Sequence, residues 1–112
     1  MPHAKFITKQ NDTTPPIEVV LTDANGFPVN LTGATVVFNM RVQPGGAVKV
    51  SGSAATIVGT ATNGRVRYNL TASDRDTADV YEGEFQVTFA GGEIQTFPAN
   101  GYIIIDIQDD IA

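Results

Sequence analysis

Apolar and polar residues alternate along several short stretches of this chain, most regularly at residues 81–89. One set of alternate positions there is apolar or small: Tyr81, Gly83, Phe85, Val87 and Phe89. The intervening positions are polar. Because successive residues of a strand point to opposite sides of a sheet, this pattern predicts a strand with one core face and one solvent face.

The same alternation recurs in shorter runs, and turn-forming Asn-Gly, Gly-Gly or Pro-Gly-Gly sequences stand between several of them. Further strands are expected at residues 17–22, 29–31, 35–42, 48–50, 56–58, 65–70, 93–97 and 102–107. Helical periodicity is absent from every stretch of ten residues. About seven short antiparallel strands joined by turns predict an all-β domain, and we expect an immunoglobulin-like β-sandwich over residues 17–112.

Tyr81 follows a polar run, residues 71–77, that suits one helical turn and a crossing between two sheets. A tyrosine at such a place resembles the corner tyrosine of immunoglobulin-like sandwiches, whose hydroxyl bonds to backbone a few residues upstream. We therefore expect Tyr81 to be a structural corner residue. The inward-facing residues of the predicted strands should form the core, and the main candidates are Phe38, Tyr68, Phe85, Val87 and Phe89.

Residues 1–16 are interpreted as an N-terminal arm with at most a short strand at residues 6–8. Pro15 and Pro16 end any ladder there, because neither can donate a backbone hydrogen bond. We favour an arm that orders on binding a neighbour. The alternative is an arm that pairs with its own sandwich as a first strand.

The last predicted strand carries apolar residues on both faces, since Tyr102 and Ile104 lie opposite its main apolar side. Something is expected to cover that second face, and the arm and a neighbouring subunit are the two candidates. Within the arm, Phe6 and Ile7 form a small apolar anchor. These four residues are the candidate partner contacts.

Composition narrows the classes of function. The chain has 112 residues, 42% of them hydrophobic, no cysteine and a net charge of −5. Disulfides and thiolate metal sites are excluded, and the acidic balance argues against nucleic-acid and anionic-membrane partners. No apolar run approaches the roughly 20 residues of a membrane span, and the opening residues do not have the apolar region of a signal peptide. We expect a soluble domain made in the cytoplasm.

Side chains able to support catalysis are scarce. The single histidine is His3, in the arm, so no held nucleophile–base pair is expected. Aspartates cluster at residues 74–79 and 106–110, without the spacing of a calcium loop, and capping or turn formation is the better interpretation. We expect no enzyme, metal site or cofactor.

Glu82 and Glu84 fall on one strand face, where a solvated sheet surface is the simplest interpretation. Arg65 and Arg67 are plausible cross-strand partners for them. A carbohydrate-binding sandwich is a further alternative, which would need exposed aromatic residues along a groove. Phe27, Phe97 and Tyr102 are the aromatic residues left for such a patch.

Five runs of the sequence resemble, in order and spacing, the N-terminal domain of bacteriophage baseplate upper proteins, the BppU-like family of tailed phages. The runs lie at residues 12–21, 22–38, 64–68, 76–89 and 96–103, and the similarity extends over residues 9–107. The resemblance implies an immunoglobulin-like sandwich located in the virion. It also implies a structural protein that docks in several copies on other phage structural proteins, without catalysis or a cofactor.

Longer members of that family continue into a helical, fibre or receptor-binding part, whereas this chain ends at Ala112. We therefore expect an accessory module of the tail or baseplate rather than a fibre. A head-decoration, neck or collar protein is the alternative within the same class, and the sequence does not separate the two.

Overall fold

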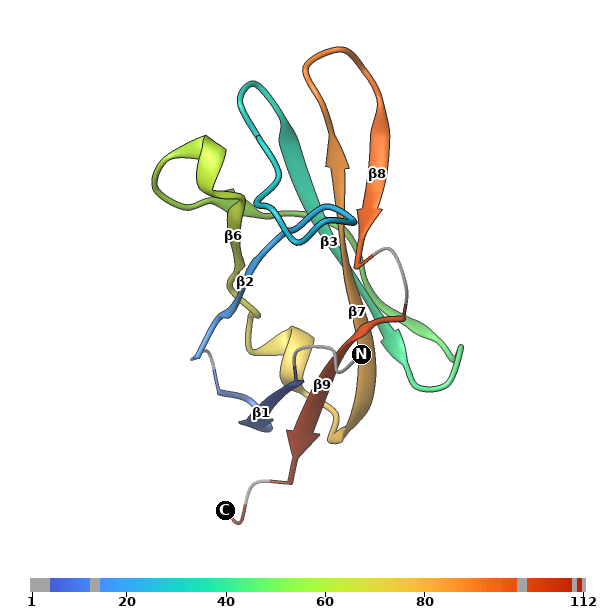
Figure 1. Cartoon of the computed structure of the whole chain (residues 1–112). Coiled ribbons are helices and arrows are strands. Elements are labelled where there is room, and N and C mark those ends of the chain that lie inside the picture. The colour runs from blue at the N-terminus through green and yellow to red at the C-terminus, as the bar shows by residue number, and fades with distance from the viewer. Residues whose placement is uncertain (1–4, 13–14, 99–100, 110, 112) are drawn as a thin grey trace.

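The computed structural model describes residues 5–12, 15–98, 101–109 and 111, and shows a β-sandwich (Figure 1). Two short 3-10 turns, η1 (Ala61–Asn63) and η2 (Ser73–Arg75), accompany the strands. The described residues contain nine strands: β1 (Lys5–Lys9), β2 (Ile17–Val20), β3 (Thr35–Val42), β4 (Val48–Ala54), β5 (Thr56–Ile57), β6 (Arg65–Tyr68), β7 (Asp79–Thr88), β8 (Ile94–Phe97) and β9 (Ile103–Gln108).

The strands form two sheets, which confirms the expected immunoglobulin-like sandwich. The larger sheet has the order β1-β9-β7-β3-β4, with β8 also paired to β7, and the smaller sheet has the order β2-β6-β5. The predicted helical turn at residues 71–77 is η2, which carries the chain from β6 in the small sheet to β7 in the large one. Three details differ from expectation: the described strands number nine rather than about seven, residues 29–31 do not form a strand, and β1 runs parallel to β9.

β7 is the centre of the larger sheet. Along one side it pairs with β3, from Tyr81 opposite Val42 to Thr88 opposite Thr35. Along its other side, residues 79–83 pair with β9 and residues 85–88 pair with β8. β8 and β9 therefore lie end to end along the same side of β7. The alternating pattern at residues 81–89 reflects this central position in the sheet.

The core lies between the sheets, where inward-facing aromatic rings meet. Phe38 of β3 stacks on Tyr68 of β6 with ring centroids 4.7 Å apart, and it contacts Phe85 of β7 at 5.0 Å. Val87 is also fully buried. Phe89 is only half-buried, because β7 ends at Thr88 and the backbone N–H of Phe89 already donates to Glu93 across a turn.

Gly83 occupies an inward position of β7 where a larger residue would require Ile105 or Phe38 to shift. A Cβ placed on it would lie 2.6 Å from Cδ1 of Ile105 and 2.9 Å from Cζ of Phe38. The backbone of β7 therefore approaches its neighbours closely at the middle of the core. The alternating sequence indicates that this residue faces inward but not that its neighbours approach so closely.

The N-terminal segment is part of the sandwich in the residues described. β1 pairs with β9 in continuous register, from Lys5 opposite Ile104 to Lys9 opposite Gln108. This is the arrangement of the alternative interpretation, in which the arm is a native first strand. Its position beside β9 leaves it at the edge of the sheet rather than over Ile104. Residues 1–4, 13 and 14 of the predicted arm lie outside the described residues.

A buried arginine explains why this segment is held against the sandwich. Arg75, in η2, is 0% exposed and donates from its guanidinium to the side chain of Thr8 and to the carbonyl of Pro15. Its own carbonyl accepts from the N–H of Asn11 at 2.9 Å. Burial lowers the pKa of Arg75. The two prolines do end the ladder, but this contact network keeps the segments on either side of them attached.

Candidate functional site

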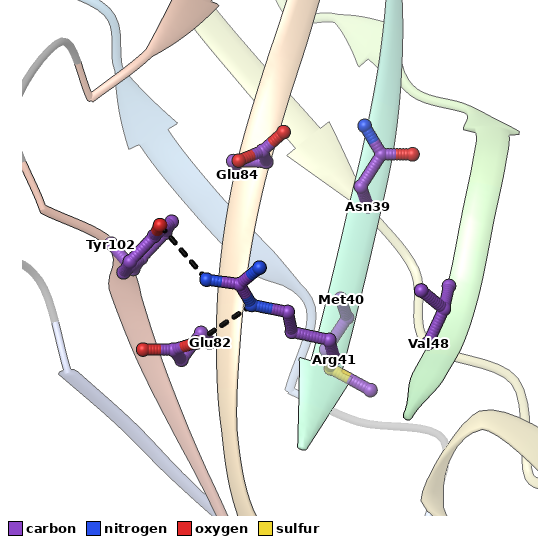
Figure 2. Close-up of a pocket in the computed structure, with 7 residues that line it drawn as sticks. All are labelled: Asn39, Met40, Arg41, Val48, Glu82, Glu84 and Tyr102. Carbon is purple, nitrogen blue, oxygen red and sulfur yellow. Dashed lines mark hydrogen bonds and ion pairs between the residues drawn. The ribbon is translucent and has the colours of Figure 1, made fainter. Parts of the chain in front are cut away.

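The side of the larger sheet that faces away from the smaller sheet is the candidate site, and we call it the outer face. It carries the alternate residues of β1, β9, β7 and β3 that do not enter the core, among them Ile7, Ile104, Glu82 and Arg41. Tyr102 precedes β9 on this face (Figure 2). The smaller sheet, β2-β6-β5, lies on the opposite side of the larger sheet.

An ion pair is fixed at the middle of the outer face (Figure 2). Arg41 and Glu82 are directly opposite each other on β3 and β7, and Nε of Arg41 donates to Oε1 of Glu82 at 2.8 Å. The same carboxylate oxygen accepts from the N–H of Gly45 at 3.1 Å. A second nitrogen of Arg41 donates to the hydroxyl of Tyr102 at 2.9 Å, and its guanidinium lies 4.9 Å from the ring centroid.

This network makes Glu82 unusual for a residue on a solvent-facing side of a sheet, since it is only 8% exposed. The hydrogen bond from Arg41, and after it that from Gly45, lowers the pKa of Glu82. The same hydrogen bond raises the pKa of Arg41. Both groups therefore stay charged and paired at neutral pH, and the guanidinium is held in one place by two partners.

A shallow hollow lies beside the ion pair. Its lining residues are Asn39, Met40, Arg41, Val48, Glu82, Glu84 and Tyr102. The hollow has a volume of about 170 Å³, below the roughly 300–1,000 Å³ of pockets that enclose small ligands. With a single aromatic ring and a carboxylate that is already paired, it offers a contact surface rather than an enclosed reaction site.

The four candidate partner contacts divide between the two faces of the sheet. Ile7 is 56% exposed on the outer face, and Tyr102 and Ile104 are half-buried there. Ile104 lies opposite Glu82 on β7 and opposite Lys5 on β1. Phe6 points the other way and packs against the core. The structure therefore brings three of the four to the same face and separates Phe6 from Ile7.

Tyr81 lies at the start of β7 with its ring in the core, 1% exposed. Its hydroxyl donates to the carbonyl of Thr77 at 2.7 Å, four residues upstream. This is the contact that a corner tyrosine makes. Burial raises the pKa of Tyr81, so the hydroxyl keeps its proton and remains a donor.

The predicted pairing of Arg65 and Arg67 with Glu82 and Glu84 is wrong. Both arginines lie on β6 in the smaller sheet, and both pair there with Glu18 of β2, at 3.3 and 2.8 Å. The glutamates of β7 belong to the other sheet. The residue missed in this prediction was Arg41, which lies on the outward side of β3. Finding its partner required the β3–β7 register.

The aspartates make turns and ion pairs. Asp74 accepts from the Tyr68 hydroxyl at 2.7 Å and from the N–H of Thr71 at 3.0 Å, and Asp76 pairs with Lys49. In the part of the chain that the structure describes, no group of three or more His, Cys, Asp or Glu is placed to hold a metal. His3 and Asp110 lie outside the described residues.

The aromatic residues do not gather into a carbohydrate-binding patch. Phe97 is 3% exposed at the end of β8, so it cannot line a groove. Phe27 is exposed in the turn at residues 23–27, where Oδ1 of Asp23 accepts from its N–H at 3.0 Å. Tyr102 is engaged with Arg41. Two exposed apolar residues that the sequence did not single out, Val48 and Ile94, lie on strands of the larger sheet.

The fold and the site together define a small immunoglobulin-like β-sandwich whose larger sheet has an exposed, partly apolar outer face. Among the described residues, no helix has the length and apolar character needed to cross a membrane.

Comparison with known proteins adds a structural neighbour. No protein-family model and no curated protein matches the sequence. Among solved structures, the chain is similar to the N-terminal domain of ORF48 of phage TP901-1, the baseplate protein BppU of that phage. The two share 18% sequence identity with a TM-score of 0.64, over 96% of this chain and 90% of the other. At that identity, the likeness shows a common fold.

Proposed function

We propose that this protein is a non-enzymatic structural component of a tailed-bacteriophage virion. In this role it is an accessory module of the tail or baseplate that makes protein–protein contacts in a multi-copy assembly. The observation that carries the proposal is the fold shared with the N-terminal domain of the TP901-1 baseplate protein over nearly the full length of both chains.

The outer face supports a contact role. It combines exposed and half-buried apolar residues, Ile7 and Ile104, with a central arginine and a tyrosine, the residue types enriched at the centre of protein interfaces. Arg41 is already held by Glu82 and Tyr102, so little side-chain freedom remains to be lost on binding. The partners are other phage structural proteins. A net charge of −5 disfavours nucleic acid and anionic membranes as partners.

Location on the particle tests the role directly. Mass spectrometry of purified virions should find the protein, and gold-labelled antibody should mark the tail or baseplate in electron micrographs. Labelling at the neck or capsid would overturn the tail assignment in favour of a collar or head-decoration protein. Absence from washed particles would overturn the proposal as a whole.

The contact surface is tested with matched variants on the two sheets. Ile104→Gln removes apolar area from the outer face, and Val20→Gln makes the same kind of change at a 40%-exposed residue of the small sheet. We expect Ile104→Gln to enter particles poorly while Val20→Gln enters normally, with both melting within a few degrees of the wild type. Equal incorporation of the two variants would exclude the outer face as the docking surface.

A further inference from the structure

The larger sheet ends on one side at β1, which pairs with β9 alone among the described strands (Figure 1). In a parallel pair, alternate residues direct their peptide groups to the neighbouring strand. The N–H of Gln10 donates to the carbonyl of Gln108 at 2.8 Å, which continues the register of Lys9 opposite Gln108. Even-numbered residues of β1 therefore direct their peptide groups toward β9. Those of Lys5 and Ile7 face the open side, as does that of Lys9, whose carbonyl already accepts from the N–H of Asp12 at 3.3 Å.

Three other strand edges of the described structure, those of β4, β5 and β2, are less suited to accepting an added strand. β4 shows register shifts against β3 and contains Gly52 at φ 62°, whose N–H donates to the side chain of Asn39. Bulges of this kind protect an edge from further pairing. β5 has two residues, and β2 follows the Pro15-Pro16 pair. β1 has five residues in unbroken register.

β1 is also held in place before any partner arrives. Thr8 is buried beneath the Arg75 guanidinium, and Phe6 packs against the core. The inward residues of the strand thus fix its position, while its outward residues remain exposed. An edge ordered in advance loses little conformational freedom when a strand is added to it.

The exposed side chains of this edge follow a charge pattern. Lys5, Ile7 and Lys9 lie on the outer face, and all three are exposed. A second copy pairing antiparallel about Ile7 would set Lys5 against Lys9, and like charges directly opposite destabilise a pair. A partner strand with carboxylates two residues before and two residues after an apolar residue would instead match every position.

We propose that β1 accepts an added strand from a partner protein, and that Lys5 and Lys9 select a strand in which two acidic residues flank an apolar one. Main-chain hydrogen bonds from Lys5 and Ile7 would supply affinity, and the lysines would supply register and specificity. The inference rests on the proposed function only in placing the partner within the virion.

Short synthetic peptides provide the probe. One carries a valine with a glutamate two residues before it and another two residues after it, in a threonine-rich background. A second carries lysines in place of the glutamates. Isotope-labelled protein is titrated with each, and amide shifts are followed by NMR. We expect the acidic peptide to shift β1 and Ile104 amides and to bind at least about tenfold more tightly than the basic one, a difference of about 1.4 kcal/mol.

Two variants separate strand addition from general electrostatic attraction. The doubly substituted Lys5→Glu, Lys9→Glu protein should prefer the basic peptide. Ile7→Pro removes an outward N–H and no β1–β9 bond, so it should weaken binding while leaving the melting temperature nearly unchanged. If the acidic peptide produced no amide shifts at about 1 mM, the proposal would be overturned. The lysines would then serve only to prevent edge-to-edge pairing with other chains. The proposal would also be overturned if the Lys5→Glu, Lys9→Glu protein still bound the acidic peptide more tightly than the basic one.

These results are independent of where the protein resides. Peptide binding at β1 in a protein that is absent from virions would overturn the proposed function and retain the edge as a binding site. A protein found in virions that binds neither peptide would keep the proposed function and lose this inference.

Discussion

The two faces of β7 are built on different principles. Its inward side, Tyr81, Gly83, Phe85 and Val87, is buried in close-packed apolar surroundings, and even one added methyl at Gly83 meets atoms of Ile105 and Phe38. Its outward side presents mainly polar residues, and Glu82 is held there by Arg41 and by the N–H of Gly45. Close packing limits the size of the side chain at each inward position, whereas on the outward side the main fixed interaction is the Arg41–Glu82 ion pair. Substitution should therefore be costly on one side of the strand and mild on the other.

The largest difference should come from truncating the middle of the inward face. Phe85→Ala opens a cavity beside Phe38 and should lower the free energy of unfolding by about 3–5 kcal/mol. Gln86→Ala, the next residue along and on the outward side, should lower it by less than about 1 kcal/mol. Urea denaturation followed by circular dichroism measures both. Similar losses in the two variants would show that the outward side is packed as tightly as the core.

β1 shows the same contrast at the edge of the sheet. Thr8→Val removes an acceptor from the buried Arg75 guanidinium and should lower the free energy of unfolding by about 1.5–3 kcal/mol. Ile7→Thr changes the adjacent outward residue and should stay within about 0.5 kcal/mol of the wild type. Chemical denaturation of the pair is the measurement. A neutral Thr8→Val would mean that Arg75 does not depend on β1.

The two tyrosines allow a milder test with the same chemical change. Tyr81→Phe leaves the carbonyl of Thr77 without its hydroxyl donor and should lower the free energy of unfolding by about 1–2 kcal/mol. Tyr102→Phe removes a half-exposed bond to Arg41 and should have less than half that effect. The midpoints of thermal unfolding of the two variants measure this difference. An unchanged midpoint for Tyr81→Phe would contradict a corner role for this residue.

The smallest effect concerns the ion pair, and it depends on pH. The pKa of Glu82 is lower in the folded protein than its ordinary value, because Arg41 and Gly45 bond to the carboxylate. The stability it contributes is therefore complete above the ordinary glutamate pKa of about 4.3 and is lost as the pH falls through the folded value. Glu82→Gln should flatten this acid loss of stability, whereas Gln86→Ala, an outward change on the same strand that removes no carboxylate, should leave it unchanged. If the free energy of unfolding of Glu82→Gln fell with decreasing pH as steeply as that of the wild type, the Glu82 carboxylate would not be the source of this pH dependence.

Much of this fold can be predicted from the local alternation of apolar and polar residues. β3 was predicted at residues 35–42 and is found at Thr35–Val42, because its alternation is uninterrupted and Gly33 and Pro44 punctuate its ends. The apolar residues on both sides of the last strand likewise placed Ile104 on the side that faces away from the core. Properties that depend on one strand alone could be predicted from the sequence, including which side of β7 faces inward.

What escaped prediction depends on contacts between distant segments. Arg75 stands in a polar run that reads as an exposed turn, and its burial arises from acceptors at Thr8 and Pro15. The Arg41–Glu82 pair follows from the β3–β7 register rather than from either strand. β4 extends to Ala54 through a run rich in serine and glycine, where pairing with β3 supplies what the local pattern does not.

The parallel arrangement of β1 and β9 has a mechanical consequence. Lys5 lies beside Ile104 at one end of the pair, and Lys9 lies beside Gln108 at the other. Tension applied to the backbone at residues 5 and 108 would pull the two strands past each other lengthwise. Hydrogen bonds in that shear geometry share the load, whereas those in a hairpin pulled from its open end break one at a time. The rupture force in a single-molecule pulling experiment would thus be set by this one pair of strands and the arginine beneath it.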